Sequence, residues 1–598
     1  IHEYNIKTCG WIQIENEKEV NPDDKRFNVD LEYEYLNIKK SKIKSIDIKD
    51  INKFIIASFD IECDSSHGDF PNPIKDLRKL CIDIVDYFKS NDYIIDCDDN
   101  NLTIKHVKDC INNSMNDNDE YINKLYLENG PISDKSIDDI LNKNTDKICE
   151  LLKNSNKSSI LREKCVKDLN KLLCYLKNEC DKKVVVTGDP VIQIGVVFHR
   201  YGDKEPYDRS IVVMGPRNDM DKSEICDDLE NINVYRCQDE KELLLKWKDL
   251  ILKHNPDYIT GYNIFGFDFD YIIKRVSVLF KCVYCKSKFN KFTKQPEITH
   301  HINCESHAFF RLGRLMKDQE KDYFENINLD NETITSKKVN GSEYFKYKEK
   351  KCNTVIKRLG NQKEDDNDFA QNTLKYIHMD GRIIFDVQNE VKKNTSLDSY
   401  KLDNVAAHFV RGKIMDKQRF KNLTTRFNTN NMGNLKVGDY ISISITTKYG
   451  EMKYNNGEKF IITSIGGTNI QIKGVLNYEN TYGDNFVKAE WCLNKDDVSP
   501  QELFRLHKEG GPDGRAKVAK YCIMDCELCI QLLLLLDFIP NNMGMSNVCY
   551  VPQTFIFLRG QGIKVQSIVN KVCSENNIRL PTLKQFKEEE SDNSGFEG

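Results

Sequence analysis

Three short motifs along the chain carry side chains that together could bind divalent metal ions. Asp60 and Glu62 stand two residues apart at the end of an apolar segment, so in a strand they would share one face. Asp268 stands at the predicted start of a helix, and Tyr521 precedes Asp525 by four residues, which puts that pair on one side of a helix. Taken singly, each motif has an ordinary explanation: a solvated strand end, a charge favoured by the helix dipole, or a Tyr–Asp pair.

Taken together, the four carboxylates favour a site for two hard divalent cations. Such cations prefer oxygen ligands and bridge to substrate phosphates. Two of them roughly 3.5–4 Å apart stabilise both the attacking and the leaving oxygen in phosphodiester hydrolysis. One carboxylate base contributes a factor of about 10²–10⁴, whereas enzymes lower barriers by about 8–23 kcal/mol. The residues therefore predict hydrolysis with two Mg²⁺ ions, Mn²⁺ being the alternative, and with Tyr521 orienting the attacking water.

The segments that must position these residues alternate between strand and helix patterns. The continuous apolar run at 54–59 indicates a strand that is buried on both faces. Further strands are expected at 191–198, 211–214 and 257–260, and helices at 240–253 and from about 515 to 536. This alternation predicts an α/β core.

Two stretches interrupt the core with a different pattern. Residues 77–187 repeat apolar side chains at helical spacing and predict a helical insertion. The simplest interpretation of that insertion is a solvated decoration without chemistry. Residues 435–475 alternate as strands do and contain Asn456-Gly457, a typical hairpin turn. We expect a small β-rich insertion over 416–485.

A third insertion, at 276–307, has the spacing of a structural zinc site. The predicted ligands are two pairs separated by 18 residues, namely Cys282, Cys285, Cys304 and His307. His300 or His301 could replace one member, and a metal-free insertion is the alternative, because chance pairs are common in a chain with 21 cysteines. Lysines between the two pairs suggest contact with DNA phosphates.

Composition excludes several classes of protein. The 598 residues carry a formal net charge of −5, which argues against a uniformly basic coat but not against a local basic channel. No window approaches the roughly 18 apolar residues of a membrane span, and no signal peptide opens the chain. The scattered cysteines indicate reduced thiols. Because the chain begins at Ile1, we expect it to be trimmed or excised from something longer.

The three carboxylate motifs, in this order, resemble the exonuclease motifs of family B DNA polymerases, D-x-E, N-x3-[FY]-D and Y-x3-D. The surrounding sequence is similar as well, and the similarity covers most of the chain outside the three insertions. It is carried by Ser58-Phe59-Asp60-Ile61-Glu62-Cys63, Gly188-Asp189-Pro190-Val191-Ile192-Gln193-Ile194-Gly195, Asp257-Tyr258-Ile259-Thr260-Gly261-Tyr262-Asn263, Gly381-Arg382-Ile383-Ile384-Phe385-Asp386 and Lys520-Tyr521-Cys522-Ile523-Met524-Asp525. With Ser66-His67-Gly68-Asp69-Phe70-Pro71, the chain looks closest to the delta-like polymerases of large DNA viruses.

The resemblance implies a ribonuclease-H-like 3′→5′ proofreading exonuclease that acts during DNA replication. In that case Asp60, Glu62, Asp268 and Asp525 are metal ligands, and Tyr521 orients the water. Asn263 and Phe267 contact the frayed single strand, in keeping with a sequence-blind editor. The implied partners are primer–template DNA with its single-stranded 3′ end and, as a further candidate, a sliding clamp, with no membrane. The implied location is intracellular, in the host cytoplasm or the nucleus.

The resemblance also divides the chain into expected domains. These are a partial N-terminal polymerase domain at 1–53, mostly of strands, an exonuclease domain at 54–76, 188–415 and 486–540, the insertions at 77–187, 276–307 and 416–485, and a linker at 541–598. We find no polymerase motifs after the exonuclease, and Phe596-Glu597-Gly598 resembles the start of the linker motif that precedes the palm. We therefore expect palm, fingers and thumb to have been cut off or to lie on another chain. Two alternatives stay open: an inactive exonuclease fold that serves as a DNA-binding scaffold, and a free-standing nuclease.

Overall fold

The computed structural model describes most of the chain. The described residues are 52–91, 99–116, 121–217, 219–280, 308–314, 372–420, 423–433, 435–494 and 498–580, with short pieces of 1–51 and strand backbones between 286 and 359. The four predicted zinc ligands, Cys282, Cys285, Cys304 and His307, lie outside them. No described helix is both long enough and apolar enough to span a bilayer.

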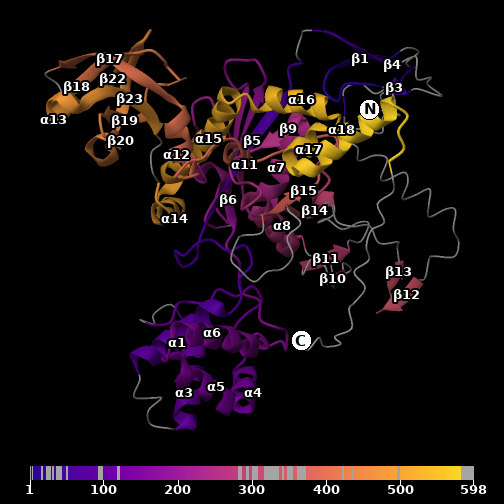
Figure 1. The fold of residues 1–598 in the computed structure, drawn as a ribbon. Helices are drawn as coiled ribbons and strands as arrows, with labels where there is room; N and C mark the ends of the chain where they lie inside the picture. Colours follow the sequence, from indigo (N-terminus) through magenta and orange to yellow (C-terminus); the bar gives the residue numbers. More distant parts are fainter. Residues whose placement is uncertain are drawn as a thin grey trace, which may run out of the picture.

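A mixed sheet forms the centre of the molecule (Figure 1). Its strands in the described residues are β5 (Ile55–Cys63), β6 (Val191–Arg200), β7 (Asp208–Met214), β8 (Asn233–Cys237), β9 (Tyr258–Thr260) and β16 (Ile383–Ile384). They lie in the order β16-β9-β5-β6-β7-β8, and only β6 runs antiparallel to its neighbours. The strands predicted at 54–59, 191–198, 211–214 and 257–260 are confirmed, and the chain has the α/β core that the sequence predicts.

Helices cover both faces of this sheet, because successive side chains of a strand point to opposite sides. Phe59 packs on α7 (Glu240–His254) and α8 (Asp268–Leu279), with ring centroids 5.5 Å from Trp247 and 5.2 Å from Phe269. The next residue, Asp60, faces α15 (Gly511–Leu535) on the other side, where it contacts Cys522. The helices predicted at 240–253 and about 515–536 therefore lie on opposite faces of the sheet.

Short elements connect and extend this core. They are β15 (Asn372–Ile377), α11 (Val387–Asn394), α12 (Leu402–Phe409), α14 (Pro500–Lys508), α16 (Phe538–Cys549), α17 (Gln553–Leu558) and α18 (Gln561–Glu575). The N-terminal pieces contain β1 (Trp11–Ile14), β2 (Lys18–Glu19), β3 (Tyr33–Glu34) and β4 (Ile43–Ile46), and the pairs are β1–β4 and β2–β3. The start of the chain packs on α16, since the Cys9 N–H donates to Asn547 Oδ1 at 2.7 Å.

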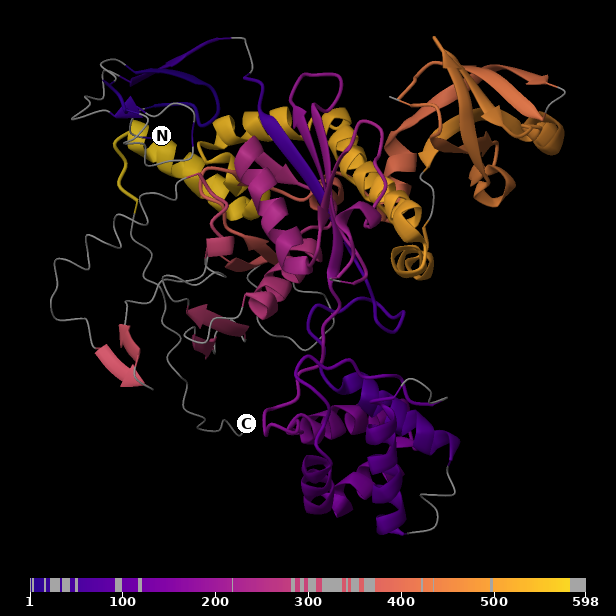
Figure 2. The same ribbon diagram turned by 180° about the vertical axis from the view of Figure 1, so that it is seen from behind.

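Residues 77–187 form a helical body with a hydrophobic core of its own, below the sheet in Figures 1 and 2. Its helices are α1 (Arg78–Ser90), α3 (Asn100–Asn113), α4 (Asp134–Lys143), α5 (Thr145–Ser155) and α6 (Ser159–Leu173). The chain leaves and re-enters the core at adjacent points, because the Asp189 N–H donates to the Asn72 carbonyl at 2.8 Å.

Residues 411–494 form a small antiparallel barrel that stands beside α12 and α15 (Figure 1). Its strands are β17 (Arg411–Phe420), β18 (Thr424–Thr429), β19 (Tyr440–Thr447), β20 (Gly450–Lys453), β21 (Lys459–Gly466), β22 (Asn469–Lys473) and β23 (Phe486–Asn494), with the short helix α13 (Tyr478–Tyr482) before the last. Pairing of β19 with β23 closes the ring, and β20 extends from β19.

The barrel differs from the sequence pattern in two respects. The barrel begins with β17 and ends with β23, and these two strands pair with each other. It therefore covers residues 411–494, a longer segment than the 416–485 expected from the sequence. Asn456-Gly457 does not join paired strands: it lies in a 3₁₀ turn between β20 and β21, each of which pairs with β19. Two-residue hairpins instead join β19 to β20 at Lys448-Tyr449 and β21 to β22 at Gly467-Thr468.

Candidate active site

Four carboxylates from three elements converge beside β5. Asp60 and Glu62 leave the same face of the strand. Asp268 is the first residue of α8, and Asp525 lies in α15. Burial raises the pKa of Asp60 well above its ordinary value, and the charges of the three other carboxylates raise this pKa further. The structure thus brings together the four residues that the sequence suggests as metal ligands.

The start of α8 is tied directly to the strand. The Ile61 N–H donates to Asp268 Oδ1 at 3.2 Å, and since Ile61 lies between Asp60 and Glu62, this bond holds Asp268 beside both. Asp268 is 2% exposed. Burial is the main reason that its pKa rises to about 7, and Asp386 adds to the effect. A cation bound nearby would stabilise the ionised form of this buried carboxyl group.

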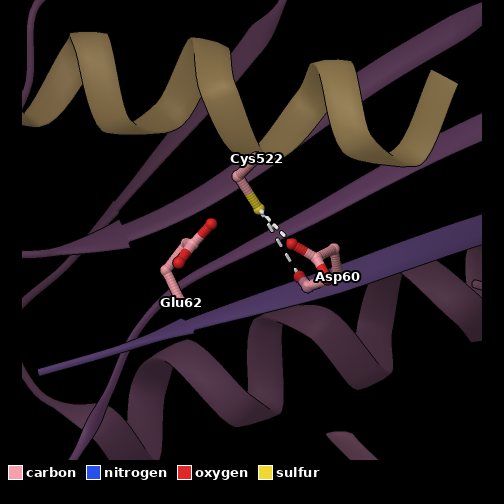
Figure 3. A group of neighbouring side chains, drawn as sticks. All are labelled: Asp60, Glu62 and Cys522. Carbon is pink, nitrogen blue, oxygen red and sulfur yellow. Dashed lines mark hydrogen bonds between the residues drawn. The ribbon is translucent and has the colours of Figure 1, made fainter. Parts of the chain in front are cut away.

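Helix α15 brings a thiol to the same place, which the sequence reasoning did not consider. Cys522 Sγ lies 3.8 Å from Asp60 Oδ2 and 3.5 Å from the Asp60 carbonyl oxygen (Figure 3). Burial raises the pKa of Cys522 well above its ordinary value, so the thiol stays protonated and donates to Asp60. Tyr521 is half-buried, one turn before Asp525 on the same helix.

A glycine makes this close approach of helix and strand possible. Gly195 of β6 is paired with Asp60 in the sheet register. A Cβ atom at Gly195 would lie 2.8 Å from Cys522 Sγ and 3.3 Å from Cys526 Sγ. Any side chain at this position would push α15, and with it Asp525, away from the strand.

The loop from β9 to α8 presents the two residues expected to contact DNA. Asn263 adopts a left-handed conformation, with φ of 60°, and its N–H donates to Asp386 Oδ1 at 2.9 Å. The Phe265 N–H donates to the other oxygen of Asp386 at 3.1 Å. Burial nevertheless raises the pKa of Asp386 to about 6. Asp386 thus shapes the loop that places Asn263 and Phe267 next to the carboxylates.

A second loop, 64–75, adds an aromatic ring that the sequence reasoning missed. The Phe70 side chain is exposed, and its ring centroid lies 5.7 Å from that of Phe267. The buried Asp189 holds the loop in place, because it accepts hydrogen bonds from the Asn72 N–H at 2.9 Å and from Lys75 Nζ at 2.6 Å. Asp189 and Asp386, the acceptors that hold the two loops, both stand in the sequence segments quoted above. Their donors are brought to them by the fold, so the sequence spacing alone does not identify them.

The donor atoms of this site suit hard divalent cations. All four carboxylates offer oxygen ligands, and the raised pKa values of Asp60 and Asp268 show that nearby positive charge does not compensate the cluster. One oxygen each from Asp60 and Glu62 and Sγ of Cys522 lie within 4.8 Å of one another (Figure 3). The residues present therefore fit divalent metal ions.

Comparison with known proteins agrees with this geometry. Residues 1–119 and 173–348 match the family model described as "DNA polymerase family B, exonuclease domain". The whole chain is 31% identical to a DNA polymerase of Pyramimonas orientalis virus, of which it covers 43%, and 30% identical to one of Phaeocystis pouchetii virus, of which it covers 55%.

A more distant relative extends the comparison to cellular enzymes. A DNA polymerase delta catalytic subunit of Caenorhabditis elegans is 24% identical over 69% of the chain and 24% of that protein. The chain spans about half the length of the viral relatives that it matches. The chain belongs to the family B DNA polymerases of the viral type and contains the exonuclease domain of that family.

Proposed function

We propose that this part of the chain is a 3′→5′ exonuclease that removes mismatched nucleotides from primer ends during DNA replication. The observation that carries the proposal is the convergence of Asp60, Glu62, Asp268 and Asp525. Burial raises the pKa of Asp60 and of Asp268, and the three other carboxylates raise that of Asp60 further. These four residues would hold two Mg²⁺ ions, or Mn²⁺. Bound there, the ions would activate water and stabilise the charge that develops on the phosphate.

The protein residues then have distinct tasks. Tyr521, one turn before Asp525, orients the attacking water through its hydroxyl group. The Cys522 thiol donates to Asp60 and restricts the orientation of that carboxylate. Exposed Phe70 and the ring of Phe267 lie in contact and offer a surface for unpaired bases, since stacking does not depend on base identity.

The strand order supports the ribonuclease-H-like description of this domain. Three strands, β5, β6 and β7, are consecutive in sequence and adjacent in space, with the middle one reversed. The strands β9 and β16 continue the sheet on the other side of β5. We propose the domain limits given above for the exonuclease, the N-terminal domain, the insertions at 77–187 and 276–307 and the linker at 541–598, with the β-rich insertion extended to the barrel at 411–494.

The names of the relatives support a wider role for the whole protein. They are DNA polymerases, so we propose that a DNA-directed DNA polymerase is the context of this exonuclease, which favours this role over a free-standing nuclease. Primer–template DNA is then the substrate. Palm, fingers and thumb, a sliding clamp, a structural Zn²⁺ on Cys282, Cys285, Cys304 and His307, and a replication site in the host cytoplasm or nucleus remain part of the proposal.

The test is digestion of a mismatched primer end in the presence of Mg²⁺. Asp60→Ala with Glu62→Ala should slow digestion at least about a thousandfold, because several kcal/mol of charge stabilisation are lost. Asp513→Ala with Glu509→Ala removes two exposed carboxylates near the start of α15 and should leave the rate unchanged. Equal digestion by wild type and the Asp60 variant would refute the metal site, and no digestion by wild type would favour the scaffold.

A further inference from the structure

The barrel at 411–494 differs from the rest of the chain in charge. It contains twelve lysines and arginines against seven aspartates and glutamates, whereas the whole chain has a net charge of −5. Some of this positive charge is used internally: Arg411 lies 3.0 Å from Glu451, and Lys417 lies 3.3 Å from Glu479. The remaining cations require an explanation.

Unpaired cations gather on the outer face of β17, β18 and β22, which we call the barrel patch. Gln418, Arg426 and Gln471 lie side by side in the register of the three strands, and Phe420 and Lys473 lie in the next row. The described part of the chain offers no carboxylate within 4 Å of Arg426 or Lys473, and both are exposed.

The patch also carries an aromatic surface. The Phe420 side chain is 37% exposed, and the Arg426 guanidinium lies 5.3 Å from its ring centroid. Arg426 also donates to Gln471 Oε1 at 3.1 Å, which fixes its orientation. Cations around an exposed ring can bind phosphates and stack a base at the same time.

The barrel is attached directly to the helix of the proposed active site. Lys436 lies 3.8 Å from Glu527 of α15 and 3.6 Å from Glu205. A cavity of about 50 Å³ between barrel and helix is lined by Lys436 and by Asp525 itself. A strand held by the barrel would therefore lie on a body that contacts the metal-binding helix.

We propose that the barrel patch binds single-stranded DNA through Phe420, Arg426 and Lys473. The inference rests on the proposed function, because it takes its ligand from the substrate of the exonuclease. An unpaired strand is the form that fits, since a ring such as Phe420 can stack only on bases that are not already stacked in a duplex. The cations meet the phosphates of the same strand.

The test is the affinity of the full chain for a fluorescent oligo(dT), measured by anisotropy in EDTA so that no digestion occurs. Arg426→Ala with Lys473→Ala should weaken binding at least about tenfold and flatten the salt dependence by about 0.7 per lost phosphate contact. Phe420→Ala should weaken binding at least about fivefold through lost stacking. Because these side chains are exposed, thermal unfolding should stay unchanged.

Lys448→Ala with Lys453→Ala is the matched control, since it removes two cations from the β19–β20 hairpin of the same barrel. Equal weakening by this control, or unchanged binding in the patch variants, would overturn the proposal, as would weakening for duplex DNA alone. Digestion of a trinucleotide with Mg²⁺ reports on the active site separately and should be the same in all these variants. If the wild-type chain does not digest the trinucleotide, the exonuclease proposal is refuted, whereas the proposed binding surface is not.

Discussion

At the scale of single residues, the proposed site is costly for the fold without a cation. Asp268 is 2% exposed, and the pKa of Asp60 is raised by burial and by three neighbouring carboxylates. Such clusters destabilise the folded state when they ionise. Any cation that binds only the folded site recovers this energy and stabilises the protein in proportion to the logarithm of its concentration.

Removal of metal should therefore make stability depend on pH. The pKa of Asp268 is about 7 in the folded chain and 3.8 as its ordinary value, so the folded state holds the proton more tightly. The stabilising contribution of protonated Asp268 is then fully present below about pH 4. It is lost as the pH rises towards 7, and the free energy of unfolding falls by up to about 1.4 kcal/mol per pH unit. In EDTA, the melting temperature of wild type should fall over this window more steeply than that of Asp268→Asn.

The control for this prediction is the exposed Asp513→Asn, which should follow wild type. Mg²⁺ at pH 8 should raise the melting temperature of wild type and have little effect on Asp268→Asn. Parallel pH profiles for wild type and Asp268→Asn, measured by circular dichroism, would contradict the assigned environment of this carboxyl group.

At the scale of elements, local patterns were enough to predict the strands and helices of the core. The apolar runs at 54–59 and 191–198 became β5 and β6, and the helix expected from about 515 became α15. The roles of Asp189 and Asp386 could not be predicted, because each acts through backbone groups more than a hundred residues away. Pairing of β19 with β23, which closes the barrel, joins strands that are far apart in the sequence, so local turn signals do not predict it.

The packing of α15 on β6 gives a prediction at this scale. Gly195→Ala would place a methyl group 2.8 Å from Cys522 Sγ, so the helix must shift, and overpacking of this kind costs about 1–3 kcal/mol. Because α15 carries Asp525, digestion of primer ends should fall at least about tenfold while the protein still folds. The measurements are thermal unfolding and the Mg²⁺-dependent rate.

A second substitution tests the cause. Cys522→Ala removes the sulfur that the new methyl group meets, so the double variant with Gly195→Ala should recover much of the lost stability. Gly466→Ala is a control on a barrel strand, where no atom lies within 4 Å of the added Cβ. A double variant no more stable than Gly195→Ala alone would show that this contact is not the source of the defect.

At the scale of the whole molecule, the chain is one α/β core from which separate bodies extend (Figure 2). The helical body at 77–187 has its own buried core, which includes Phe88, Leu152 and Leu169. The barrel contributes positive charge to a chain that is negative overall. The small net charge is therefore the sum of a basic surface on the barrel and an acidic site in the core, which lie in different parts of the fold.

The independence of the helical body leads to a prediction about deletion. Its ends meet where Asp189 N–H donates to the Asn72 carbonyl at 2.8 Å, so a short Gly-Ser linker in place of 78–186 can close the gap without stretching the core. The shortened chain should digest primer ends within about threefold of the full chain. The deletion removes the His67–Lys124 hydrogen bond and the Lys79–Asp69 ion pair from loop 64–75, but Asp189 still holds that loop through the Asn72 N–H and Lys75. The excised segment 77–187 should be helical by circular dichroism and melt cooperatively, because its apolar side chains are buried against one another. An excised segment without cooperative melting, together with a shortened chain that has lost activity, would show that body and core stabilise each other and fold as one unit.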